Sequence, residues 1–170
     1  MTSTQTLTGE RADLIATLDA HRHFLRFTVR GLTDEQAASS PTASELNLAG
    51  LIKHVAHTEA HWAEFAVRGT AAFGADNWSA EAWAAQWRLG ADETLAGVLA
   101  EYEEIARRTD ELVATLDLDA AYPLPPAPWF EPGASRSVRR TFLHIIAETA
   151  QHAGHADILR ESIDGQKTMG

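Results

Sequence analysis

The sequence predicts an all-α protein: one four-helix-bundle domain over residues 1–170, with a short extra helix in a crossover connection. Four long segments carry apolar residues at helical spacing, two longer connections separate them, and no segment has the alternation of a convincing strand. A chain of 170 residues is long enough for one hydrophobic core and too short for two comfortable domains.

The first helix is expected over residues 10–31, with Gly31 as its stop. One apolar stripe runs along this segment and consists of Leu14, Ile15, Leu18, Leu25 and Val29. A short polar turn follows, and the second helix is expected over residues 46–68. It should start just after an S/T-x-x-E capping box, in which the side chains of Thr42 and Glu45 satisfy backbone N–H groups.

Residues 69–90 are less regular and should hold one short helix in a crossover connection. Its aromatic anchors are expected to be Trp78, Trp83 and Trp87. A third long helix is expected over residues 91–116. Five prolines exclude a helix between residues 118 and 133 and predict a stiff loop. The last helix is expected over residues 135–163, with Gly165 in its stop signal.

Charge and cysteine content exclude several classes of function. A balance of 14 basic against 24 acidic residues gives a formal net charge of −10, which repels phosphate backbones and argues against a nucleic-acid partner. No cysteine is present, so any metal must be bound by histidine and carboxylate. Neither a secretory signal nor a run of eighteen apolar residues is found. We therefore expect a cytoplasmic protein with no membrane partner.

Metal-type donors recur every four residues near the C-terminus, at His144, Glu148 and His152. Residues i and i+4 share one face of a helix, so both the His144/Glu148 pair and the Glu148/His152 pair suit one ion. The spacing alone leaves open which pair binds and whether the column is structural instead. His155 is displaced about 60° round the helix from His152, which suits a place beside the ion or facing a substrate.

A second cluster of histidines lies in the second predicted helix, at His54, His57 and His61. Two helical turns, about 10.5 Å, separate His54 from His61, so these two cannot bind the same ion. A lone cluster of this kind is more often solvated than metal-bound. Two clusters on two core helices, in a chain without cysteine, favour a shared metal ion. Glu59 and Glu64 are expected to be exposed, with Glu59 nearer the site.

Both clusters lie in stretches that resemble the DinB-like superfamily of metal-binding four-helix bundles. The likeness is strongest to its actinobacterial branch, which is related to mycothiol-dependent enzymes and to the N-terminal domain of maleylpyruvate isomerase. The matching stretches are GLTDEQA at 31–37, LNLAGLIKHVAHTEAHW at 46–62 and SVRRTFLHIIAETAQHAGHADILRESIDG at 137–165. The resemblance covers nearly the whole chain, and E-T-A-x-H-x-G-H-x-D-x-L-R-E-x-I-D-G is its most specific element.

Carried over by position, the resemblance implies a divalent metal bound by His54, Glu148 and His152. Many relatives have His-x-x-x-His on the last helix, whereas the mycothiol-dependent maleylpyruvate isomerases have Glu-x-x-x-His. The resemblance also implies zinc or another divalent ion with open positions for water or a thiol. Histidine and carboxylate donors by themselves suit zinc, nickel, iron or manganese. The residues expected around these ligands are His57, Glu59, His144 and His155.

The expected function is that of a metal-dependent S-transferase, in which a low-molecular-weight thiol such as mycothiol attacks a small electrophile. Three protein donors with open positions are typical of a catalytic site. Two imidazoles and one carboxylate leave a divalent ion with a charge of about +1, which suits a thiolate. Arg139 and Arg140 are candidates to bind an acidic group of the cofactor, and a solvated helix end is the alternative role for them.

Two other functions stay open at this point. One is a metal hydrolase that uses a metal-bound hydroxide, with Glu59 or His57 as the base. The other is a non-catalytic metal-binding stress or structural protein, in which His57 or His155 supplies a fourth ligand. A homodimer through exposed helix faces is the protein assembly that we consider for such a bundle.

Overall fold

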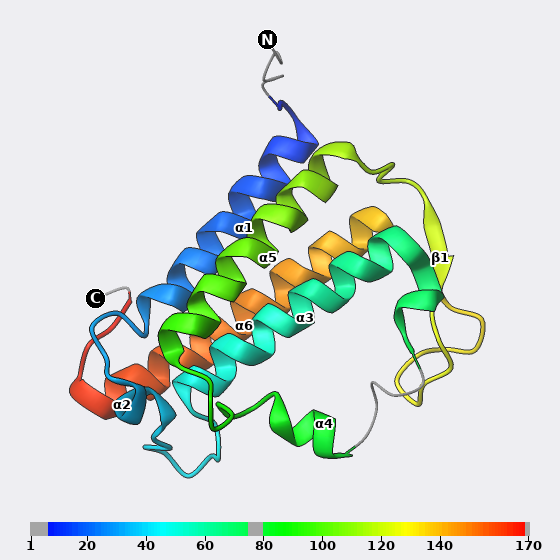
Figure 1. Ribbon diagram of the computed structural model, residues 1–170. Coiled ribbons are helices and arrows are strands. Elements are labelled where there is room, and N and C mark those ends of the chain that lie inside the picture. Colours follow the sequence, from blue (N-terminus) through cyan, green and yellow to red (C-terminus); the bar gives the residue numbers. More distant parts are fainter. Residues whose placement is uncertain (1–6, 75–79, 169–170) are drawn as a thin grey trace.

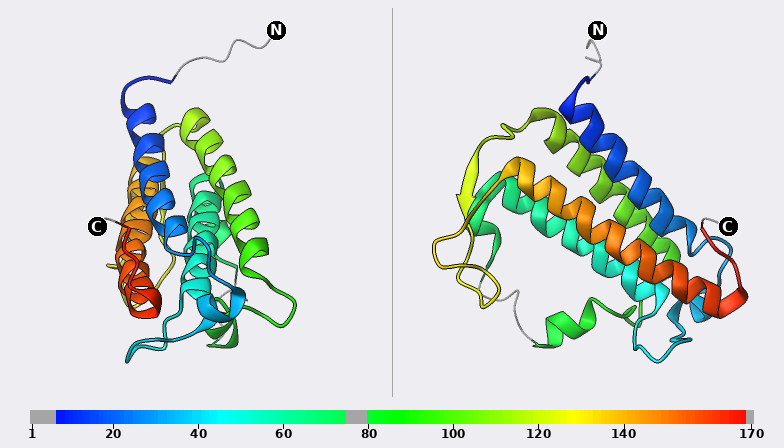
Figure 2. Two further views of the ribbon diagram at one scale, coloured as in Figure 1. Left: turned by 90° about the vertical axis from the view of Figure 1, so that its left-hand side faces the viewer. Right: turned by 180° about the vertical axis from the view of Figure 1, so that it is seen from behind.

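Figure 1 shows a computed structural model of the protein, which describes residues 7–74 and 80–168. Four long helices lie side by side: α1 (Glu10–Phe27), α3 (Leu48–Arg68), α5 (Leu95–Thr115) and α6 (Val138–Asp164). Seen edge-on in Figure 2, α1 and α6 form one layer and α3 and α5 form the other, and α3 also packs along α6. The predicted all-α class and four-helix bundle are confirmed. None of the described helices is long and apolar enough to cross a membrane.

Within the described residues, five short elements lie in the connections. They are α2 (Asp34–Ala38), the 3-10 helix η1 (Gly69–Ala72), α4 (Ala80–Ala85) and the strands β1 (Ala121–Pro123) and β2 (Ser135–Ser137). Helix α4 is the extra helix expected in the crossover connection, although Trp78 and the side chain of Trp83 lie outside what the structure describes. The antiparallel pair β1–β2 was not predicted, because three-residue strands are too short to show alternation.

The capping box predicted at Thr42 and Glu45 is wrong. The side chain of Asn47 caps α3 by accepting the backbone N–H of Gly50 at 2.8 Å, and the helix begins at Leu48. Asparagine serves as well as serine or threonine at this position, so the S/T-x-x-E pattern upstream was a chance match. A true capping box does occur at the start of α2, within the segment that was expected to be a turn.

The other helix boundaries differ from the predicted ones by a few residues. Helix α1 ends at Phe27, before the expected Gly31, and α5 starts at Leu95. Helix α6 starts only at Val138, because the three residues before it pair with β1. Its end at Asp164 is as expected, since Gly165 takes the left-handed conformation (φ 78°) that closes a helix.

Two hydrophobic clusters fill the two ends of the bundle interior, and a polar layer separates them. One cluster contains Leu25, Ile52, Tyr102 and Leu159, and the other contains Leu18, Phe65, Val113 and Phe142. On each long helix, a buried polar residue falls between the positions that serve the two clusters. These residues are Arg22, Glu59, Thr109 and Thr149. The candidate donors on α3 and α6 lie beside this layer.

Candidate metal centre

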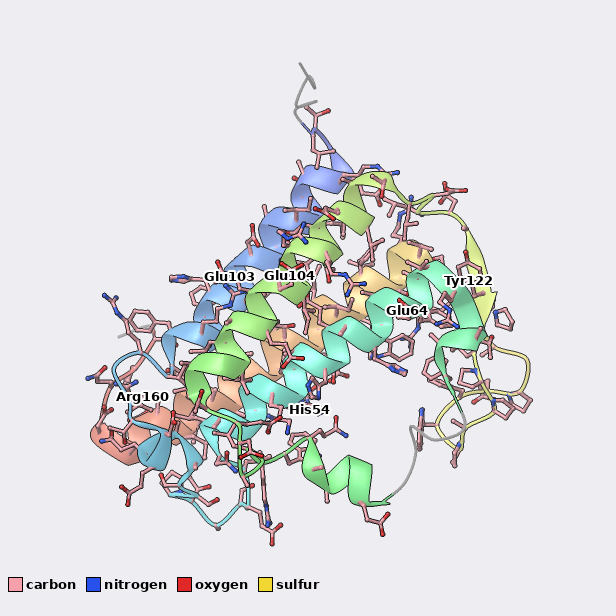
Figure 3. The ribbon with its side chains drawn as sticks, in the orientation of Figure 1. His54, Glu64, Glu103, Glu104, Tyr122 and Arg160 are labelled. Atoms are coloured by element: carbon pink, nitrogen blue, oxygen red, sulfur yellow. The ribbon has the colours of Figure 1, made fainter. Side chains whose placement is uncertain are left out.

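His54 of α3 comes together with Glu148 and His152 of α6, and one ligand atom of each lies within 4.8 Å of the other two. The rings of His54 and His152 are 4.9 Å apart and meet at 80°. The carboxylate of Glu148 lies 3.7 Å from Nε2 of His152, as the i, i+4 spacing requires. Figure 3 labels His54 on the side of α3 that faces the connection containing α4. Two imidazoles and a carboxylate form a donor set that suits a divalent metal ion.

The ring of His54 is oriented by two residues of the connection between α4 and α5. Its Nδ1–H donates to the side-chain oxygen of Gln86 at 3.0 Å, which fixes the tautomer in which Nε2 carries no proton. The indole of Trp87 stacks on the same ring, with centres 3.8 Å apart and planes 17° apart. Burial lowers the pKa of His54 to about 4, so the imidazole is neutral near pH 7. A neutral, oriented imidazole is what metal binding needs.

Glycine at position 50 lets this connection approach α3. The carbonyl oxygen of Trp87 lies 1.9 Å from the place that a Cβ on Gly50 would occupy, so any larger residue would push the connection away. Asn47 also holds the connection, because its side-chain N–H donates to the same carbonyl at 3.3 Å. Sequence reasoning missed Gln86 as a site residue and expected Trp87 only as an anchor of the short helix, which ends at Ala85. A further signal was Gly50, a glycine inside the apolar-periodic run over residues 46–68.

His144 and His155, the two histidines predicted beside the ligands, contact the α6 donors. Nε2 of His144 lies 3.7 Å from the second carboxylate oxygen of Glu148, and burial lowers the pKa of His144 to about 4. Nδ1 of His155 lies 3.4 Å from Nδ1 of His152. The pKa of Glu148 is lowered chiefly by His152 and further by His144, so its carboxylate is ionised at neutral pH. These contacts orient both donors of α6.

The remaining residues predicted around the ligands face elsewhere. Nε2 of His57 lies 3.7 Å from Glu101 of α5, and His57 is not part of the donor group found among the described residues. Glu59 was expected to be exposed, and this is wrong: its side chain is completely buried and binds the guanidinium of Arg22. An arginine on a neighbouring helix makes such burial tolerable, and helix periodicity cannot reveal that partner. Glu64 reaches the surface, with 39% of its side chain exposed.

The two arginines considered for cofactor binding differ in their surroundings. Arg139 binds the carboxylates of Glu10 and Asp119, and so ties the start of α1 and the loop before β1 to α6. Arg140 is exposed and has no ion-pair partner among the described residues. Arg136, which the sequence analysis did not select as a site residue, stacks on an aromatic ring of α3. Arg140 is thus the more available of the two candidates.

The helix arrangement and the donor set on α3 and α6 define a DinB-like four-helix bundle. The sequence model of a family described as "Mycothiol-S-transferase" matches residues 13–165, and the chain belongs to this family. Among solved structures, the chain is similar to the "conserved protein of locus from Enterococcus faecalis". That likeness has a TM-score of 0.69 at 13% identity, covers 94% of this chain and 100% of the other, and concerns the fold alone. Comparison with curated proteins gives no significant match.

Proposed function

We propose that the protein is a divalent-metal-dependent S-transferase that joins a low-molecular-weight thiol, mycothiol, to a small electrophile. The observation that carries this proposal is the convergence of His54, Glu148 and His152 within 4.8 Å, in a chain of the mycothiol-S-transferase family. These three residues would hold the ion, and zinc is expected because it accepts imidazole, carboxylate and sulfur ligands alike. Nickel, iron and manganese also suit part of this set.

The bound ion would supply a Lewis acid that lowers the pKa of a thiol. The protein's own contribution is to present the three donors in fixed orientations. The side-chain oxygen of Gln86 holds the tautomer of His54, and His155 contacts the far nitrogen of the His152 ring. His144 lies against the outer oxygen of Glu148. Such contacts around a metal site are typically worth 10- to 100-fold in affinity or activity.

In the transfer, the thiol would lose its S–H proton to water, and its sulfur would bond to an electrophilic carbon of the second substrate. In a substitution, a leaving group departs from that carbon with its electron pair. In an addition, no group leaves, and the neighbouring carbon of the double bond takes up a proton. No external oxidant or reductant is needed for either outcome. We place this reaction in the cytoplasm, where low-molecular-weight thiols are kept reduced.

The contacts of Glu59 and His57 favour the S-transferase over a metal hydrolase. A hydrolase needs a base next to the attacking water, but Glu59 is buried against Arg22 and His57 pairs with Glu101. The non-catalytic alternative needs a fourth protein ligand, and the donor group found among the described residues has three members. Three ligands with open positions are typical of a catalytic site.

The test is a conjugation assay with mycothiol and a bimane electrophile, using zinc-loaded protein, metal-free protein and the variant His152→Ala. We expect zinc-dependent formation of the thioether, and a fall to the metal-free rate in the variant. A zinc-loaded protein that forms no more thioether than the metal-free protein would contradict the proposal. Turnover of ester or amide substrates without any thiol would support the hydrolase instead.

A further inference from the structure

Arg136 of β2 has its guanidinium among aromatic rings rather than carboxylates. The central carbon of the guanidinium lies 4.3 Å from the centre of the Trp62 ring and 5.8 Å from that of Phe130. None of the described residues forms a hydrogen bond or ion pair with this side chain, and its Nη1 is buried without an acceptor. A chain with 24 acidic residues offers many carboxylates, and Arg22, Arg107, Arg139 and Arg160 all bind them. Arg136 therefore has unused capacity for an anion from outside the chain.

This cation lies next to the candidate metal centre. The ring of Trp62 contacts Arg136 on one side and meets the ring of His144 edge-on at 4.8 Å. His144 in turn lies 3.7 Å from the carboxylate of Glu148. A ligand bound at Arg136 would therefore have its other end close to the three donors.

Flat apolar groups surround the same place. Phe73 meets the ring of Trp62 at 5.5 Å, and the ring of His61 meets Phe73 at 4.6 Å. Burial lowers the pKa of His61, so the ring is neutral near pH 7, and its buried Nε2 has no hydrogen-bond partner within the described part of the chain. The aromatic set formed by Trp62, Phe73 and Phe130 suits the body of a flat, apolar molecule. It also keeps the guanidinium of Arg136 in place through its π faces.

From this arrangement we propose that the guanidinium of Arg136 binds the carboxylate of the electrophile. The electrophiles are then small aromatic or unsaturated acids, bound with the apolar body against the aromatic set and the reactive carbon toward His54, Glu148 and His152. An arginine presents a planar pair of N–H donors that matches a carboxylate in a way that a lysine cannot. The identification of the bound acid as the electrophile rests on the function proposed above. Binding of a carboxylate at Arg136 can be tested by itself, without any thiol.

The test compares benzoate with benzamide, which share one shape but differ in charge. Binding is followed by NMR through the indole N–H signal of Trp62, which the variant Trp62→Phe identifies, in metal-free protein so that the ion cannot bind benzoate. We expect benzoate to bind roughly tenfold or more tightly than benzamide. Arg136→Gln should remove this preference. Arg107→Gln makes the same charge change at an exposed site on α5 and should keep it.

Equal binding of the two probes by the unchanged protein would overturn the subsite, as would a full preference for benzoate in Arg136→Gln. Should Arg136→Gln fail to fold, Arg136→Lys decides: the charge without the paired donors should keep a reduced preference, and no preference at all refutes the proposal. The outcomes are separable from those of the proposed function. If benzoate is preferred but no thiol is conjugated, the carboxylate subsite is supported and the S-transferase function is contradicted. If conjugation depends on zinc but benzoate is not preferred, the function is supported and the subsite is contradicted.

Discussion

The carboxylate of Glu59 lies 2.5 Å from the guanidinium of Arg22 in the middle of the bundle, and both side chains are buried. Asp110 of α5 binds the same guanidinium at 2.9 Å. The cluster joins α1, α3 and α5 in the polar layer between the two hydrophobic clusters. Glu59, one turn from the donor-bearing part of α3, therefore stabilises the bundle and is not one of the three donors of the candidate metal centre.

Removing one partner of this pair should destabilise the protein strongly. Arg22→Met leaves the Glu59 carboxylate buried without a counter-charge, so we expect the free energy of unfolding in urea to fall by about 3–5 kcal/mol. The double variant Arg22→Met/Glu59→Leu should recover most of that loss. If the double variant is as unstable as the single one, the buried charge is not the cause. Arg107→Met, at an exposed ion pair on α5, should change stability by no more than about 1 kcal/mol.

Two histidines one turn apart on α3 should differ in their effect on metal content. His54→Ala removes one of three donors, and we expect stoichiometric zinc to be lost after dialysis, as measured by elemental analysis. His57→Ala, which breaks only the contact with Glu101, should keep zinc at the level of the unchanged protein. Equal zinc in both variants would mean that the ion binds elsewhere.

Gly50→Ala should weaken zinc binding without touching any donor. The added Cβ would lie 1.9 Å from the carbonyl oxygen of Trp87, so the connection must move and Gln86 would leave His54. Loss of this oriented contact should cost about 10- to 100-fold in zinc affinity, measured by competition with a chromogenic chelator. The matched change Gly154→Ala meets no atom within 4 Å and should leave affinity unchanged while adding roughly 0.5–1 kcal/mol of stability.

The metal-free protein should lose stability as the pH falls from 7 to 5. Burial lowers the pKa of His54 and of His144 to about 4, below the ordinary value of 6.5. Below about pH 6.5 the unfolded chain therefore binds more protons than the folded one, and each residue should cost about 2 kcal/mol by pH 5. Thermal unfolding at both pH values measures this. His144→Ala should make the loss of stability between pH 7 and 5 smaller, whereas His23→Ala, at an exposed position, should leave it unchanged. If both variants lose stability as steeply as the unchanged protein, the effect comes from other groups.

The long helices were predictable because their signals are local. Apolar spacing located all four, and Gly165 marked the end of α6 correctly. The prediction failed where two local patterns competed for the same helix start: Asn47 caps α3, and the predicted capping box of Thr42 and Glu45 does not. It also failed for β1 and β2, whose pairing joins residues on either side of a proline-rich loop.

The sequence by itself determined the bundle, the column of donors on α6 and the histidines on α3, because helical periodicity places residues i and i+4 on one face. It left open which donors meet, since that depends on how α3 and α6 pack. Only the tertiary structure brought His54 to Glu148 and His152 and enclosed Glu59 with Arg22. It likewise brought Gln86 and Trp87 onto His54, through a close approach at Gly50. The physical reason is that each of these contacts joins residues of different elements, whose relative placement is set by burial across the bundle and not by local spacing.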